Sequence, residues 1–125
     1  MKNTIAFPRD EITASDVADT DELGNPLQVG AYRGIQVAVD VYALVGGATI
    51  TPAIEAYVPA LGVWQQVLAG AMIAAAGSVV LTVLPEITPV ANLRASQAIE
   101  DRFRVTLTYG AGTSATLAVA VSMVP

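Results

Sequence analysis

The stretch of sequence that decides the fold runs from residue 102 to residue 123 and reads RFRVTLTYGAGTSATLAVAVSM. Apolar side chains occupy every second position on both sides of a glycine-rich turn at residues 110–113. This period of two is typical of extended strands that bury one face. The stretch therefore predicts a strand at Arg102–Tyr109 and a return strand, joined as a hairpin. The return strand places these residues on one face: Ala115, Leu117, Val119, Val121 and Met123.

The same period of two recurs upstream, in segments separated by turn residues. Gly46 and Gly47 separate the first two segments, and Pro52 within the second predicts an edge strand or a β-bulge. Residues 69–77 predict a crossing loop or one helical turn. The strand after them is apolar on both faces, as expected of a central strand. The predicted strands are Gly34–Leu44, Thr49–Val58, Val63–Leu68 and Val79–Leu84.

About seven or eight short strands and no sustained helical period predict an all-β chain. Their spacing favours an antiparallel β-sandwich and leaves open whether its topology is immunoglobulin-like or jelly-roll-like. Residues 1–32 hold six of the 11 acidic residues and show no sustained periodicity. We therefore expect an extended acidic N-terminal arm and loop over 1–32, with room for a short strand at Glu11–Ser15. A sandwich domain over 33–125 follows it.

The composition excludes whole classes of function. The chain has 125 residues and contains neither histidine nor cysteine, which rules out disulfides, Cys/His zinc sites, and Ser-His-Asp or Cys-His catalysis. Its formal net charge of -5 argues against general binding to nucleic acid or to an anionic membrane. We therefore expect no enzyme activity and no cofactor.

The apolar excess also raises the question of a membrane span. The chain is 54% hydrophobic and 14% charged, and Val67–Leu84 reads VLAGAMIAAAGSVVLTVL without a charge. Glutamates, not Lys or Arg, are the nearest charges on either side, so the positive-inside signal is missing. The segment also changes period midway, from small residues to a β-branched run that ends at Pro85. These features predict strands rather than a transmembrane helix. The first 11 residues, MKNTIAFPRDE, have no apolar core before Pro8, so no secretory signal is expected either.

Two groups of acidic residues are candidates for chemistry. The first is a weak Ca²⁺ candidate, because several carboxylates in a loop can supply the oxygens that Ca²⁺ prefers, although the spacing is not that of an EF-hand. The second is a pair, Asp40 and Glu55, on facing positions around the Gly46-Gly47 turn, where glycoside hydrolysis would need two close carboxylates. No aromatic cluster accompanies the pair, which favours solvent-facing charges. The Ca²⁺ candidates are Asp16, Asp19, Asp21 and Glu22.

The partner-binding candidates are of two kinds. The arginines are the one cationic grouping of the sequence. They predict either cross-strand ion pairs or a docking point for an acidic surface, such as the acidic arm of a neighbouring copy. The alanines fall at positions that should face water in a lone sandwich, and small uncharged faces suit close packing against a partner. The candidates are Arg94, Arg102 and Arg104, with Ala38, Ala118 and Ala120.

Two long segments together carry a family resemblance. Residues 34–85 read GIQVAVDVYALVGGATITPAIEAYVPALGVWQQVLAGAMIAAAGSVVLTVLP, and residues 101–125 read DRFRVTLTYGAGTSATLAVAVSMVP. This pattern resembles the small β-sandwich decoration (cement) proteins and minor head proteins of tailed bacteriophages. It covers residues 33–125 and carries no catalytic residue. The resemblance implies a virion structural protein on the capsid surface that binds the major capsid protein, with a homo-oligomer, a trimer by preference, and no nucleic acid or membrane partner.

Other classes of function stay open at this point. One is an immunoglobulin-like or carbohydrate-binding module of a tail or cell-surface protein, which exposed aromatic residues in one groove would favour. Another is a pilus or surface-layer subunit. The aromatic residues available for such a groove are Tyr32, Tyr42, Tyr57 and Trp64.

Overall fold

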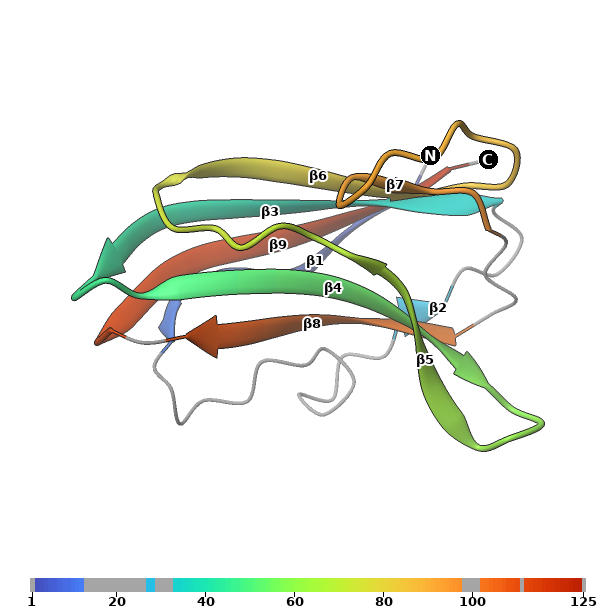
Figure 1. The fold of residues 1–125 in the computed structure, drawn as a ribbon, viewed down its shortest axis with the longest axis horizontal. Coiled ribbons are helices and arrows are strands. Elements are labelled where there is room, and N and C mark those ends of the chain that lie inside the picture. Colours follow the sequence, from blue (N-terminus) through green and yellow to red (C-terminus); the bar gives the residue numbers. More distant parts are fainter. Residues whose placement is uncertain (1, 13–26, 29–32, 98–101, 111, 125) are drawn as a thin grey trace.

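The computed structural model describes residues 2–12, 27–28, 33–97, 102–110 and 112–124, and it shows no helix in them (Figure 1). Nine strands in these residues form two sheets. All pairings within the sheets are antiparallel except that of β6 with β7. The strands are β1 (Lys2–Ile12), β2 (Leu27–Gln28), β3 (Gly34–Val45), β4 (Thr49–Val58), β5 (Val63–Ala69), β6 (Gly77–Val83), β7 (Arg94–Ala95), β8 (Arg102–Gly110) and β9 (Ser114–Val124).

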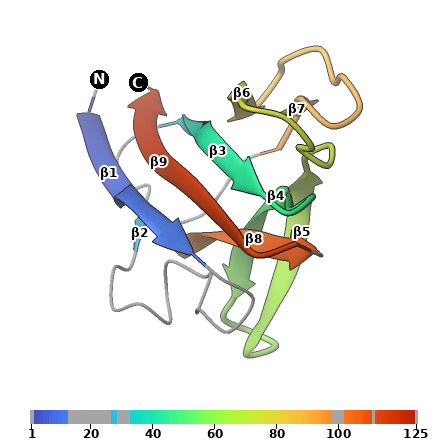
Figure 2. The ribbon, with the colours of Figure 1, turned by 90° about the vertical axis from the view of Figure 1, so that its left-hand side faces the viewer.

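The two sheets lie in two layers with the core between them. The five-stranded sheet has the order β1-β9-β3-β6-β7, and the four-stranded sheet has the order β2-β8-β4-β5. Figure 2 shows β1, β9 and β3 in one layer and β8, β4 and β5 in the other. The inward side chains alternate with outward ones along β3, β8 and β9, as the period of two predicts. The largest fully buried ones are Phe103, Ile35, Ile50, Ile54, Leu81 and Leu117.

Both sheets share one long two-stranded ribbon that folds over on itself. β3 pairs with β9 as far as Val45 opposite Ser114, and β4 pairs with β8 from Thr49 opposite Gly110. Val45 and Thr49 are as far apart along the chain as Gly110 and Ser114 are, so the register continues through the corner. The Thr113 amide donates to the Val45 carbonyl at 2.9 Å and holds the two crossing segments together.

This corner corrects two predictions. The expected hairpin at residues 102–123 is wrong, because β8 and β9 belong to different sheets and pair with β4 and β3 instead. The Gly46-Gly47 turn likewise leads from one sheet to the other. Both glycines there have positive φ, and so does Gly112 on the neighbouring segment. A sharp corner and a hairpin turn both require left-handed backbone, so glycine residues mark both in the sequence.

Pro52 lies in β4, and β4 is an internal strand between β8 and β5. The prediction of an edge strand is therefore wrong. The proline is tolerated because it lies where the pairing with β5 has ended: Ala53 is opposite Ala69, the last residue of β5. The Pro52 carbonyl there accepts a hydrogen bond from the Gly70 amide at 2.8 Å. The register of β4 with β5 shifts between Ile54 and Glu55, so an irregularity does occur close by.

The apolar run at residues 67–84 falls into three parts: the end of β5, a crossing segment and β6. The crossing segment pairs back onto β4 through Ile73 and Ile50. β6 behaves as a covered strand in its second half alone, since Leu81, Thr82 and Val83 are buried while Val80 is 49% exposed. Among the described residues, no helix is long and apolar enough to cross a membrane.

The described part of the first 32 residues adds strands to both sheets. β1 pairs along β9 at the edge of the five-stranded sheet, and β2 pairs with β8. The strand thus begins earlier than the predicted Glu11–Ser15. The register of β1 shifts on both sides of Phe7, close to Pro8, and a proline is accommodated at such an edge.

Candidate interaction surfaces

Small side chains gather on the outer face of the five-stranded sheet where β3 pairs with β9. Ala38 on β3 lies opposite Ala120 on β9 and Val80 on β6. The next outward residue of β3, Asp40, lies opposite Ala118 and Ser78. We call this surface the alanine face and define it as Ala38, Asp40, Tyr42, Ser78, Ala118 and Ala120.

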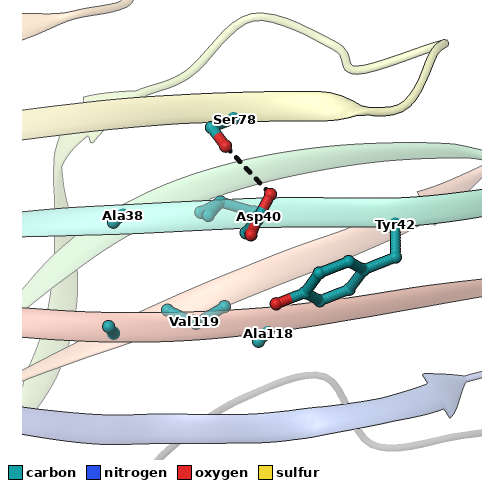
Figure 3. Close-up of a pocket in the computed structure, with 8 residues that line it drawn as sticks. Ala38, Asp40, Tyr42, Ser78, Ala118 and Val119 are labelled. Carbon is teal, nitrogen blue, oxygen red and sulfur yellow. Dashed lines mark hydrogen bonds between the residues drawn. The ribbon is translucent and has the colours of Figure 1, made fainter.

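The alanine face contains a shallow recess of about 300 Å³ (Figure 3). Three alanines form its floor, together with Val39 and Val119, whose side chains are fully buried on the inner face. Tyr42 reaches from β3 toward β9, with its ring beside Ala118. The recess lies where three outward positions of β3 and β9 are occupied by alanine, at Ala38, Ala118 and Ala120.

One charged group belongs to the alanine face. The Ser78 hydroxyl donates to Asp40 Oδ1 at 2.9 Å. No basic side chain of the described residues pairs with the Asp40 carboxylate. The face therefore presents a carboxylate, the Ser78 hydroxyl group, the Tyr42 ring and three methyl groups within one recess.

The outer face of the four-stranded sheet has the opposite character. Glu55 and Tyr57 of β4 lie between the arginines of β8 and Trp64 of β5. The Arg104 Nε donates to Glu55 Oε1 at 2.6 Å, and both side chains are about four-fifths buried. We call this group the arginine–aromatic cluster and define it as Glu55, Tyr57, Trp64, Arg102 and Arg104.

The rings of the cluster are stacked against its cations. The Arg104 guanidinium lies 4.4 Å from the centre of the Trp64 ring, and that of Arg102 lies 5.1 Å from it. Arg102 also lies 5.0 Å from the Tyr57 ring, which meets Trp64 edge-on at 5.3 Å. Such contacts bind strands of one sheet to each other. The positive charge that the sequence offers here is largely engaged within the chain.

The structure separates some of the candidates that the sequence groups together. Arg94 lies on β7 of the five-stranded sheet, so it is not part of a patch with Arg102 and Arg104. Asp40 and Glu55 lie on the outward faces of different sheets, so the expectation that they face each other is wrong. This follows from the sheet-to-sheet corner at Gly46-Gly47.

The Ca²⁺ candidates Asp16, Asp19, Asp21 and Glu22 all lie outside the described residues. Within the part that is described, no group of three or more acidic residues is placed to hold a metal ion.

The pairing of Trp64 with the arginines escaped the sequence analysis. The signal was partly present, since Trp64, Tyr57 and the arginines all occupy outward positions of alternating strands. Their contact also requires β8, β4 and β5 to be neighbours, and that order comes from long-range pairing. The roles of Ser78 and Tyr42 in the recess depend on long-range pairing in the same way.

The chain was also compared with known proteins. No family model matches it, and no curated protein gives a significant match.

Proposed function

We propose that the chain is a virion structural protein: a decoration (cement) protein that binds the outer surface of a phage head and stabilises contacts between major capsid protein subunits. The alanine face is the observation that carries this proposal. Four of its six residues are alanine or serine, and only one of the six is charged. The resemblance to phage head proteins over residues 33–125 supplies the identity of the partner.

A face of this kind favours the binding of a partner for two physical reasons. Small side chains let the backbone of a partner approach closely, and few charges have to be stripped of water. The core of a protein interface is depleted in charged residues for the same reason. The arginine–aromatic cluster is less suited to this role, because its groups already contact one another.

The order of the strands supports a jelly-roll topology rather than an immunoglobulin-like one. In a jelly roll, two sheets of four strands arise from antiparallel ribbons that fold over and contribute to both sheets. Here β1-β9-β3-β6 faces β2-β8-β4-β5, and the β3–β4 and β8–β9 segments form such a ribbon. The topology by itself carries no function.

The proposal is tested by binding to heads assembled from the major capsid protein of the genome that encodes this chain. The wild-type chain should co-sediment with expanded heads to saturation. Ala120→Asp should bind at least about tenfold more weakly, because it places a carboxylate on the docking face without a partner. Thr106→Asp is the matched control, since it adds the same charge to the outer face of the other sheet.

Three results would contradict the proposal. One is a genome without a capsid gene, another is a wild-type chain that stays in the supernatant, and the third is a folded Ala120→Asp variant that binds as wild type does. Sedimentation equilibrium of the free chain tests the expected trimer in the same preparation.

The alternative, a carbohydrate-binding module, has one observation in its favour: Tyr57 and Trp64 lie side by side on an outer sheet face. Sugars bind flat against an aromatic ring. Against the alternative, the Arg104 guanidinium already lies 4.4 Å from the centre of the Trp64 ring. Trp64 is the single tryptophan, so its fluorescence reports this surface directly. Saturable quenching by oligosaccharides would support the alternative, and an unchanged spectrum across a glycan panel would reject it.

A further inference from the structure

We propose that the recess on the alanine face binds the side chain of an arginine, contributed by a partner protein. The inference rests on the proposed function only for the source of that arginine. The recess itself is defined by the residues of this chain.

The carboxylate provides the polar half of the site. Asp40 Oδ1 accepts one hydrogen bond from Ser78, which fixes the orientation of the carboxylate at the wall of the recess. Asp40 Oδ2 has no partner among the described residues. A planar guanidinium can donate to both oxygens of a carboxylate at once, and such charge-assisted hydrogen bonds are stronger than neutral ones. Arginine is therefore a better complement than lysine.

The alanine floor provides the apolar half. Ala38, Ala118 and Ala120 line the recess beside Asp40, in a volume of about 300 Å³. That volume is at the lower end for small-ligand sites, and it suits one long side chain rather than a large ligand. The methylene stem of an arginine can lie on the methyl groups while its charged end reaches the carboxylate.

The same chain offers a precedent for this chemistry on its other sheet. Glu55 there accepts a hydrogen bond from Arg104 at 2.6 Å, and the arginine lies against apolar ring surface. Asp40 also points outward beside apolar side chains, and the described residues supply it with no cation.

A partner protein is favoured over a second copy as the source of the arginine. The chain carries a net charge of -5, so two copies repel each other at long range, while a basic partner is attracted. Arginine is also among the residues enriched in protein interfaces.

The test is a nuclear magnetic resonance titration of the ¹⁵N-labelled full chain with N-acetyl-arginine amide at constant ionic strength. Saturable shifts should concentrate at the amides of residues 38–42, 78–80 and 118–120. N-acetyl-citrulline amide has nearly the same shape and no charge, so it should bind about three- to fivefold more weakly. N-acetyl-lysine amide should fall between the two.

Two variants and one control complete the test. The Asp40→Asn variant should bind the arginine probe only as tightly as the wild-type chain binds the citrulline probe. Ala118→Leu should abolish binding, because it fills the recess while keeping the charge. Glu86→Gln removes the same charge from an exposed site, where Glu86 lies 4.0 Å from Arg33, and should bind as wild type does.

Scattered shifts, equal binding of arginine and citrulline, or an Asp40→Asn variant that binds as wild type does would overturn the inference. The titration contains no phage heads, so failure of the recess and failure of head binding are separate results.

Discussion

The two outer faces of this molecule are built on the same ribbon and differ in how their charges are used. On the four-stranded sheet, Arg104 is held by Glu55 and lies against Trp64. On the five-stranded sheet, Asp40 has a hydroxyl group from Ser78 and no cation among the described residues. The face with more charged and aromatic residues is therefore the one whose groups already contact partners within the chain.

This difference shows why counting charges along a sequence does not locate a docking surface. The arginines are prominent in the sequence, yet Arg104 follows the alternative of a cross-strand ion pair. The alanine face is chemically plain, yet none of the described residues supplies a cation to its one carboxylate. A binding surface is better located by the groups that remain without a complement inside the chain.

The largest expected effect comes from the corner that connects the two faces. Gly112→Ala places a Cβ against the backbone of Ala48 and also has to adopt a φ of +78°. We expect a loss of about 3 kcal/mol or more in the free energy of unfolding, because a positive φ and a backbone collision add. Denaturation in urea, followed by tryptophan fluorescence, measures it.

Gly47→Ala is the matched control for the corner. Gly47 has the same φ of +78°, but a Cβ there meets no atom within 4 Å. It should lose about 1 kcal/mol, the cost of the backbone conformation by itself. Equal losses in the two variants would show that the crossing segments are not in contact at the corner.

The second effect concerns the arginine–aromatic cluster. Trp64→Ala removes a ring that contacts two guanidiniums and one tyrosine. We expect a loss of about 2 kcal/mol, from two partly exposed cation–π contacts and an edge-on aromatic pair. The melting temperature measures it, with the exposed Gln66→Ala on the same strand as the control. A loss no larger than that of the control would mean that the cluster does not stabilise the sheet.

A smaller effect is expected from the ion pair of the same cluster. Glu55→Gln keeps the shape of the side chain and removes the charge that holds Arg104. The loss should be about 1 kcal/mol, since the pair is only partly shielded from water. The measurement is unfolding in urea at low and at high salt. The loss should shrink as salt rises, and a salt-independent loss would contradict an ionic contribution.

The sequence was informative where the information is local. The alternation of residues 34–44, 49–58 and 102–109 predicted strands whose ends the structure moves by only a residue or so. It could not predict which strands are neighbours, because Gly46-Gly47 and residues 110–113 look like hairpin turns and are corners between sheets. The errors about the hairpin and about the Asp40–Glu55 pair both follow from that single ambiguity. The error about Pro52 has another cause, because the pairing of β4 with β5 ends beside it and spares the proline a missing hydrogen bond. The recess escaped for the same reason, since it exists only where β3, β6 and β9 are side by side.

The smallest effect on stability is expected on the alanine face, and it separates folding from recognition there. Ser78→Ala removes one exposed hydrogen bond to Asp40, so the free energy of unfolding should change by less than about 0.5 kcal/mol. The same change leaves the Asp40 carboxylate free to rotate. Binding of the arginine probe then has to restrict that rotation, so the probe should bind about twofold more weakly. Unfolding in urea and the probe titration measure the two quantities on one sample. A large loss of stability would place Ser78 and Asp40 among the groups that hold the sheet together. The two faces would then resemble each other, because the charged groups of each would serve to stabilise the fold of this chain.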